Sequence, residues 1–306
     1  EAHHRRALAL EPAPEKAIGA LEWLVARRPG DAALYEKGLA AYRALGRLGE
    51  VVSLHERYAA ASGGATASKA LLAAATLVET ELHEGQRAFE LRQAAYEADP
   101  NDLEAAEAVL SEARRRGDVD RLELMLVRIS LATQDEQRAA ELKLELAASL
   151  ESRQQYEAAR TPLESIRRLG AGAPGYAQAL SGLERIAKAL SDSAALADVQ
   201  LASAELMGAQ ERAARLLEAA KSFREAKQLG RAMQLTRESL GARPSKAGFT
   251  LLVDLAREDG HPDELARALT QLAEQGEGVE RAVMLLQALE AWRSAGELAQ
   301  AREVFE

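Results

Sequence analysis

The chain of 306 residues contains no cysteine, and only 4% of its residues are aromatic. Without cysteine there is no disulfide, no thiolate metal site and no cysteine nucleophile. No apolar run approaches the ~20 residues that a membrane-spanning helix needs, so we expect no membrane insertion. Net positive charge is absent too. The formal net charge is −9, which is the wrong sign for binding a nucleic-acid backbone, so we expect no nucleic-acid partner.

Alanine makes up about one residue in five, and it is the strongest helix former. Arginine outnumbers lysine 31 to 8, and together with the alanine content this ratio indicates a GC-rich, bacterial genome. The chain begins with Glu1 rather than Met, and residues 302–306 resemble the opening of a helix, so we expect a fragment of a longer protein. We expect a cytoplasmic location, although a sequence without its native N-terminus leaves a signal peptide open.

A repeat of about 35 residues runs through the chain. Residues 296–305 supply the pattern: a glycine ends one helix, an alanine stands five residues later, and a bulky apolar residue follows four positions on. Aligned copies form an anchor column whose eight intervals cover 284 residues, a mean of 35.5. The anchor column consists of Ala17, Val51, Ala88, Leu122, Ala159, Leu196, Ala232, Leu265 and Ala301.

Two further columns, sixteen and nine residues before the anchor column, are mostly apolar and lie on one face of a helix. Charged exceptions in them are Glu1, Glu79 and Lys143. Prolines at positions 29, 100 and 244 follow the anchor column by twelve residues, where a helix must stop. Each period therefore predicts two helices joined by a short turn. No alternating stretch rich in Val, Ile or Thr occurs, so we expect no strand.

The expected fold is all-α, a solenoid of tandem antiparallel helix pairs. One pair of about 35 residues buries too little surface to fold alone, so neighbouring pairs must stack. We expect a single array of about nine pairs. The approximate repeats are 1–30, 31–65, 66–100, 101–135, 136–172, 173–208, 209–244, 245–276 and 277–306.

A helix–turn–helix unit with glycine at the turn, alanine in the second helix and proline at the exit resembles the tetratricopeptide repeat (TPR). Residues 95–102, Ala-Tyr-Glu-Ala-Asp-Pro-Asn-Asp, look like the end of such a repeat. The resemblance implies a right-handed superhelix whose first helices line a concave groove that binds a peptide or protein segment. Intervals of up to 37 residues depart from the family's period, so a related superhelix of looser helix pairs is the alternative.

A basic column lies eight residues before the anchor column, at the end of each predicted first helix. One explanation is helix capping, because cations complement the free carbonyls and dipole of a helix C-terminus. The other is a ladder of cations that binds acidic or phosphorylated protein segments. Six of its nine positions are basic, and these are the candidate partner-binding residues Arg43, Arg114, Lys188, Arg224, Arg257 and Arg293.

Two local motifs have competing interpretations. Thr161-Pro162-Leu163-Glu164 matches a capping box with proline at the first helical position, so we expect a kink or a restart inside the second helix of that pair. Residues 170–175 spell a literal GxGxxG, but a helix precedes them where a dinucleotide site needs a strand. We interpret them as a loop between repeats.

We find no catalytic, metal-binding or cofactor-binding motif, and we therefore expect no enzyme, no metal and no cofactor. The expected function is a protein-interaction scaffold or adaptor. One alternative is a regulatory or targeting array of a larger enzyme whose catalytic domain lies outside these residues. An enzyme within the chain and a self-assembling structural element are weaker alternatives. Nothing in the sequence indicates a homo-oligomer.

Overall fold

The computed structural model describes residues 14–305, and these residues form seventeen α-helices and no strand. The predicted all-α fold is confirmed. The helices are α2 (Pro14–Arg27), α3 (Ala32–Ala44), α4 (Leu48–Ser62), α5 (Gly64–Thr80), α6 (Gly85–Ala98), α7 (Leu103–Arg116), α8 (Val119–Ala132), α9 (Glu136–Ser152), α10 (Tyr156–Arg167), α11 (Tyr176–Ala189), α12 (Ser193–Ala204), α13 (Ala209–Glu225), α14 (Leu229–Ala242), α15 (Lys246–Asp259), α16 (Pro262–Glu274), α17 (Gly278–Ser294) and α18 (Leu298–Phe305).

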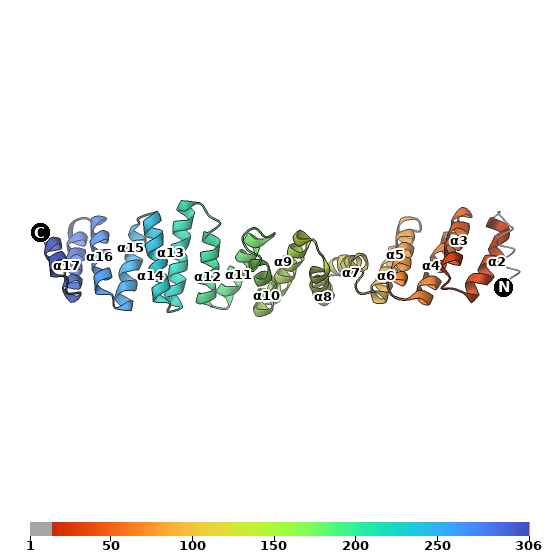
Figure 1. Cartoon of the computed structure of the whole chain (residues 1–306), viewed down its shortest axis with the longest axis horizontal. Coiled ribbons are helices and arrows are strands. Elements are labelled where there is room, and N and C mark those ends of the chain that lie inside the picture. Colours follow the sequence, from red (N-terminus) through yellow and green to blue (C-terminus); the bar gives the residue numbers. More distant parts are fainter. Residues whose placement is uncertain (1–13, 306) are drawn as a thin grey trace. The chain divides into compact units, whose positions relative to one another are not determined.

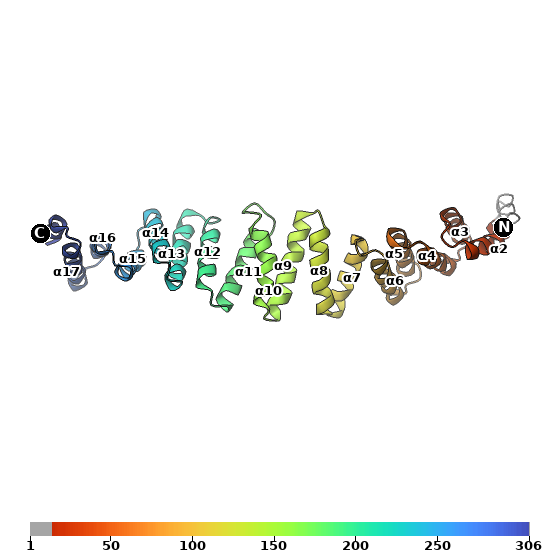
Figure 2. The same ribbon diagram turned by 60° about the horizontal axis from the view of Figure 1, so that its bottom comes forward.

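The chain divides into two compact units between Leu142 and Lys143, inside α9. Helices α2 to α8 of the first unit pack in chain order, and so do α10 to α18 of the second (Figures 1 and 2). The predicted tandem helix pairs are thereby confirmed. We call the odd-numbered helices from α3 to α17 first helices and the even-numbered ones second helices. A single array of nine pairs and its right-handed superhelix remain predictions.

The second helix of the first predicted repeat is α2, and the predicted first helix of that repeat falls within residues 1–13, outside the described residues. Position Ala9 of the basic column lies there too. Helix α5 begins at Gly64, two residues before the predicted interval 66–100. The repeat boundaries stay a prediction.

The turns between the two helices of a pair resemble one another throughout the described residues. A residue with positive φ stands five positions before the anchor column in all eight turns. In seven of them the next residue's N–H donates to the carbonyl five residues back, as Asp192 does to Ala187 at 2.9 Å. This is the Schellman end of a helix, in which the left-handed residue is usually glycine. The positive-φ residues are Gly46, His83, Gly117, Gln154, Ser191, Lys227, Gly260 and Gly296.

Small residues of the anchor column are buried between the packed helices. Its alanines and valine are fully buried at Val51, Ala88, Ala159 and Ala232. Leu196 and Leu265 are only half-buried, and the alanines that follow them, Ala197 and Ala266, have no exposed surface. A small residue therefore occupies the close contact in these pairs as well, one position later than the alignment predicts.

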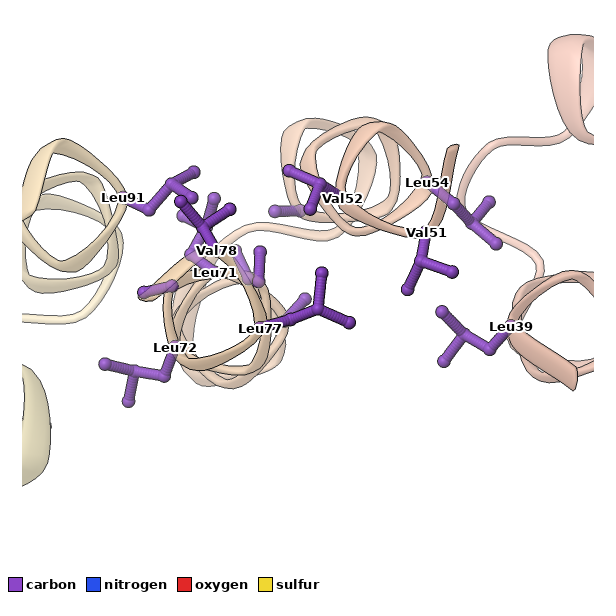
Figure 3. Packing of buried hydrophobic residues seen from close by; sticks show 14 of the residues in the cluster. Leu39, Val51, Val52, Leu54, Leu71, Leu72, Leu77, Val78 and Leu91 are labelled. Carbon is purple, nitrogen blue, oxygen red and sulfur yellow. The ribbon is translucent and has the colours of Figure 1, made fainter. Parts of the chain in front are cut away.

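The packing of the first unit explains one charged exception among the apolar columns. Glu79 is exposed, and Val78 beside it is completely buried. The turn after α5 is one residue longer than the others, because Glu84 N–H donates to the carbonyl of Val78, six residues back, at 3.1 Å. Figure 3 shows Val78 beside Leu91, and it shows Leu39 and Val51 pointing toward one another between α3 and α4.

Of the kink or restart predicted at Thr161, the restart is wrong, because α10 runs unbroken from Tyr156 to Arg167, and the kink stays a prediction. Pro162 lies inside the helix, where it lacks one N–H donor. Pro162 itself is buried, and Leu163 and Ile166 on the same helix are at most 1% exposed. Burial of this face against neighbouring helices therefore outweighs the local capping signal.

Replacing a non-glycine turn residue by glycine should stabilise the chain. For Ser191→Gly we expect the free energy of unfolding to rise by about 1 kcal/mol, because an L-residue pays a steric cost in the left-handed region that glycine avoids. Urea unfolding followed by circular dichroism measures this change. Gly260→Ser is the matched reverse variant and should lose a similar amount. A destabilised Ser191→Gly would contradict the role of this turn.

Candidate functional site

The six candidate residues of the basic column all lie in the last turn of a first helix. Residues of this column carry the positive charge at the C-terminal turns of α3, α7, α11, α13, α15 and α17. In α9 the same position is Glu151, and that helix has no basic residue in its last turn. This placement suits interaction with the helix dipole and leaves both explanations of the column open.

Arg224 holds two successive first helices together. Its Nη1 lies 3.2 Å from Asp254 Oδ2, and its guanidinium also pairs with Glu258, both on α15. The hydrogen bond from Arg224 is the main reason why the pKa of the Glu258 carboxyl lies below its usual value. The Arg224 side chain is 32% exposed. Arg224 is therefore an internal tie between α13 and α15, a role that neither explanation from the sequence included.

Lys188 pairs within α11 with a carboxylate that also binds Arg215 of α13. Its Nζ lies 2.9 Å from Glu184 Oε1, and Glu184 also accepts a hydrogen bond from Arg215 of α13. Burial alone would raise the pKa of Glu184, but the hydrogen bonds from Arg215 and Lys188 outweigh it and lower the pKa. Lys188 thus has an internal carboxylate partner in the second unit.

Other ion pairs join first helices of successive repeats in the same way. Arg185 of α11 lies 3.0 Å from Glu151 of α9, and Lys246 of α15 lies 2.7 Å from Glu280 of α17. Both pairs, like Arg224 and Glu258, are 34 residues apart. Opposite charges about one repeat apart are therefore a signal in the sequence that separates ties from free cations, and the basic column alone does not reveal it.

Three other arginines of the basic column differ from Arg224 in having no carboxylate partner in the described part of the chain. Arg43, Arg257 and Arg293 are exposed, and no carboxylate of the described residues lies within ion-pair distance of them. Arg114 is exposed in the last turn of α7 and interacts within the chain. In the second unit, Arg257 on α15 and Arg293 on α17 are thus the cations of the basic column that no carboxylate of the described residues neutralises.

A groove of about 790 Å³ lies between the first helices α13 and α15. Basic residues on its walls are Lys221, Arg224, Lys227 and Lys246. Arg224 and Lys246 are tied to carboxylates, whereas Lys221 and Lys227 are exposed. The groove is therefore polar and open, suited to an extended chain rather than to a buried small molecule.

A second cavity, of about 820 Å³, lies between α15, α16, α17 and α18. Phe249, Leu252 and Trp292 give it an apolar floor. The guanidinium carbon of Arg267 on its wall lies 5.9 Å from the centre of the Trp292 ring. None of the six candidate residues lines this cavity.

We also searched the described residues for a metal site, a dinucleotide site and a membrane-spanning helix. Among residues 14–305 no group of three His, Asp or Glu side chains is placed to hold a metal ion. Residues 170–175 connect α10 to α11, two helices, so the loop lacks the strand that a dinucleotide site requires. No helix in the described part of the chain has both the length and the apolar character to cross a bilayer.

Arg43 lies near a buried histidine of the first unit. His55 is 2% exposed, its Nδ1 lies 2.6 Å from the Tyr35 hydroxyl, and its Nε2 has no hydrogen-bond partner among the described residues. Burial, and secondarily the charge of Arg43, lower the pKa of His55 to about 4. The Tyr35 ring stacks on Tyr58 with centroids 3.9 Å apart. His55 is therefore neutral at pH 7 and part of the core.

The buried His55 makes stability depend on pH. Between pH 6.5 and 4 the unfolded chain binds a proton at His55 that the folded chain does not, so the free energy of unfolding should decrease as the pH falls through this window. The variant His55→Leu should show a weaker decrease. Urea unfolding at several pH values compares the two proteins. Identical pH dependence would contradict the neutral state of His55.

The ties and the free cations should differ in their effect on stability. Arg224→Gln should lower the free energy of unfolding at pH 7 by less than about 1 kcal/mol, because its ion pairs are partly exposed. The loss relative to the unaltered chain should vanish as the pH falls through the lowered pKa of Glu258, because the protonated carboxyl no longer attracts Arg224. Urea unfolding from pH 7 to 3 tests this. Arg257→Gln is the control, and an equal loss there would contradict the distinction.

No protein-family model matches the sequence, and no curated protein matches it. A chain of the solved APC/C hetero-tetramer Cut9–Hcn1 is 14% identical over 90% of this chain, with a TM-score of 0.31, and this chain spans 52% of its length. The C-terminal part of a TPR protein from Cytophaga hutchinsonii is 17% identical over 81% of this chain and 99% of its own, with a TM-score of 0.34.

A tetratricopeptide repeat protein from Parabacteroides merdae is 13% identical over 83% of this chain and 98% of its own, with a TM-score of 0.34. Two of these three structures are thus tetratricopeptide proteins, the family that the sequence resembles. The similarity concerns the fold alone.

Proposed function

We propose that this chain is a non-catalytic scaffold or adaptor that binds an acidic or phosphorylated protein segment on the face of its first helices. Tetratricopeptide proteins generally mediate interactions between proteins, and their fold is typically non-catalytic. The observation that carries the proposal is the pair Arg257 and Arg293. Both are exposed in the last turns of α15 and α17, and neither has a carboxylate partner among the described residues.

A groove beside α15, the helix that carries Arg257, supports the same partner, although Arg257 does not line it. Exposed Lys221 and Lys227 line the groove between α13 and α15. Arg224 ties these two helices together, so that the walls of the groove are fixed before a ligand arrives. A guanidinium binds a carboxylate or phosphate with two parallel hydrogen bonds. Of the six candidate residues, we therefore assign binding to Arg257 and Arg293, an inter-helix tie to Arg224, and an ion pair within α11 to Lys188.

Peptide binding tests this function. Fluorescence anisotropy of the full chain with labelled twelve-residue peptides should detect peptides rich in Asp and Glu or bearing phosphoserine, and not a lysine-rich peptide. Binding should weaken as salt is added, because the contacts are between exposed charges. The double variant Arg257→Glu/Arg293→Glu should weaken binding at least about tenfold, which is ~1.4 kcal/mol.

The matched control for this experiment is Arg168→Glu/Arg243→Glu. These exposed arginines lie at the C-caps of the second helices α10 and α14, and the charge change is the same. The dissociation constant of the control should lie within about twofold of that of the unaltered chain, because salt screens the effect of net charge. Equal losses in the two double variants would show a response to net charge alone. Failure of every acidic peptide to bind would refute the proposed function.

A further inference from the structure

An apolar stripe lies exposed on the second helix α8. The side chains of Leu124, Val127 and Leu131 are 52%, 40% and 77% exposed. Their spacing of three and four residues places them on one face of the helix. Within the described part of the first unit, large exposed hydrophobic residues occur only on α7 and α8, where Leu103 and Val119 are the others. The stripe is therefore a local feature of this pair, whose helix α8 can be found in Figure 2.

The packing of the array does not account for this stripe. Its residues stand two, five and nine positions after the anchor column, and at these positions the other second helices carry mainly polar or small residues. The other second helices thus have a hydrophilic face at these positions, so the packing of helix pairs does not require an apolar face there. Examples are Ser53, Glu56 and Ala60 of α4, Glu90, Gln93 and Glu97 of α6, and Arg267, Thr270 and Glu274 of α16.

Two arginines flank the stripe on one side. Arg121 and Arg128 are seven residues apart and therefore lie on the same side of α8. No carboxylate of the described residues lies within ion-pair distance of either guanidinium. The guanidinium carbon of Arg128 lies 5.9 Å from the centre of the Tyr96 ring of α6. The surface thus combines the apolar stripe with two positively charged side chains along one side of it.

The two arginines favour an acidic partner helix over a second copy of this chain. In an antiparallel pairing of two α8 helices, Arg121 and Arg128 of one copy would face the same arginines of the other, and like charges repel. Glu123 on the opposite flank and Asp120, one turn before Leu124, already interact within the chain and are not free to pair with a second copy's arginines. The complementary surface is an amphipathic helix with leucine-like residues at three-four spacing and carboxylates along one edge.

We propose that the outward face of α8 is a docking site for such an amphipathic helix of a partner protein. Its apolar residues pack on Leu124, Val127 and Leu131, and its Asp or Glu side chains pair with Arg121 and Arg128. Helix α8 has 14 residues, which is about 21 Å of contact length, or four turns. This site lies on a second helix and is separate from the first-helix face proposed above.

Two synthetic helical peptides test the proposal on the full chain. Both carry the same leucine stripe, and one has glutamates on the flank where the other has lysines. Fluorescence anisotropy should show the glutamate peptide binding at least tenfold more tightly. The variant Leu124→Ser/Leu131→Ser should weaken this binding at least tenfold. Arg121→Glu/Arg128→Glu should reverse the preference so that the lysine peptide binds more tightly.

Leu169→Ser/Leu206→Ser is the matched control, because these leucines are 65% and 46% exposed outside the stripe. It should bind as the unaltered chain does, and circular dichroism should show all variants folded. Equal binding of the two peptides, or undiminished binding by Leu124→Ser/Leu131→Ser, would overturn the proposal. A chain that sediments as a dimer, and as a monomer only in that variant, would assign the face to a second copy instead.

Discussion

Burial of apolar surface between neighbouring helix pairs is the constraint on which this structure depends. A pair of about 35 residues encloses too little apolar surface to be stable, so each pair uses the next as part of its core. In the second unit, one cluster of buried residues extends from Ala197 of α12 to Ala288 of α17. Close approach needs small side chains where helices meet, and fully buried alanines such as Ala159 and Ala232 supply them.

Stacking also determines what the surface residues do. Successive first helices lie side by side, so a charge on one meets a charge on the next, as with Arg224 and Glu258 or Lys246 and Glu280. These contacts use part of the positive charge for internal ties. What remains, such as Arg257 and Arg293, is the smaller set to which we assign the proposed partner-binding surface. The same distinction applies on α8, where Arg121 and Arg128 lie beside the apolar stripe and have no carboxylate partner among the described residues.

The sequence predicts the helix pairs well because one physical period controls them. Turn position, buried alanine and apolar columns all recur at that period, and the positive-φ turns follow it even where glycine is absent, at Gln154 and Lys227. The helix restart at Thr161 was mispredicted because a local capping signal competes with burial that is only visible in three dimensions. The ties of Arg224 were missed because residue type alone does not show which carboxylate lies opposite.

The most direct test of this account is hydrogen exchange of the chain after Phe223→Ala, which removes a fully buried ring from the α12–α17 core. Truncation of a buried Phe costs about 3–5 kcal/mol. If neighbouring pairs share one core, exchange should accelerate in α12, α14 and α15 as well as in α13. Faster exchange confined to α13 would contradict the account, because each pair would then be stable without its neighbours.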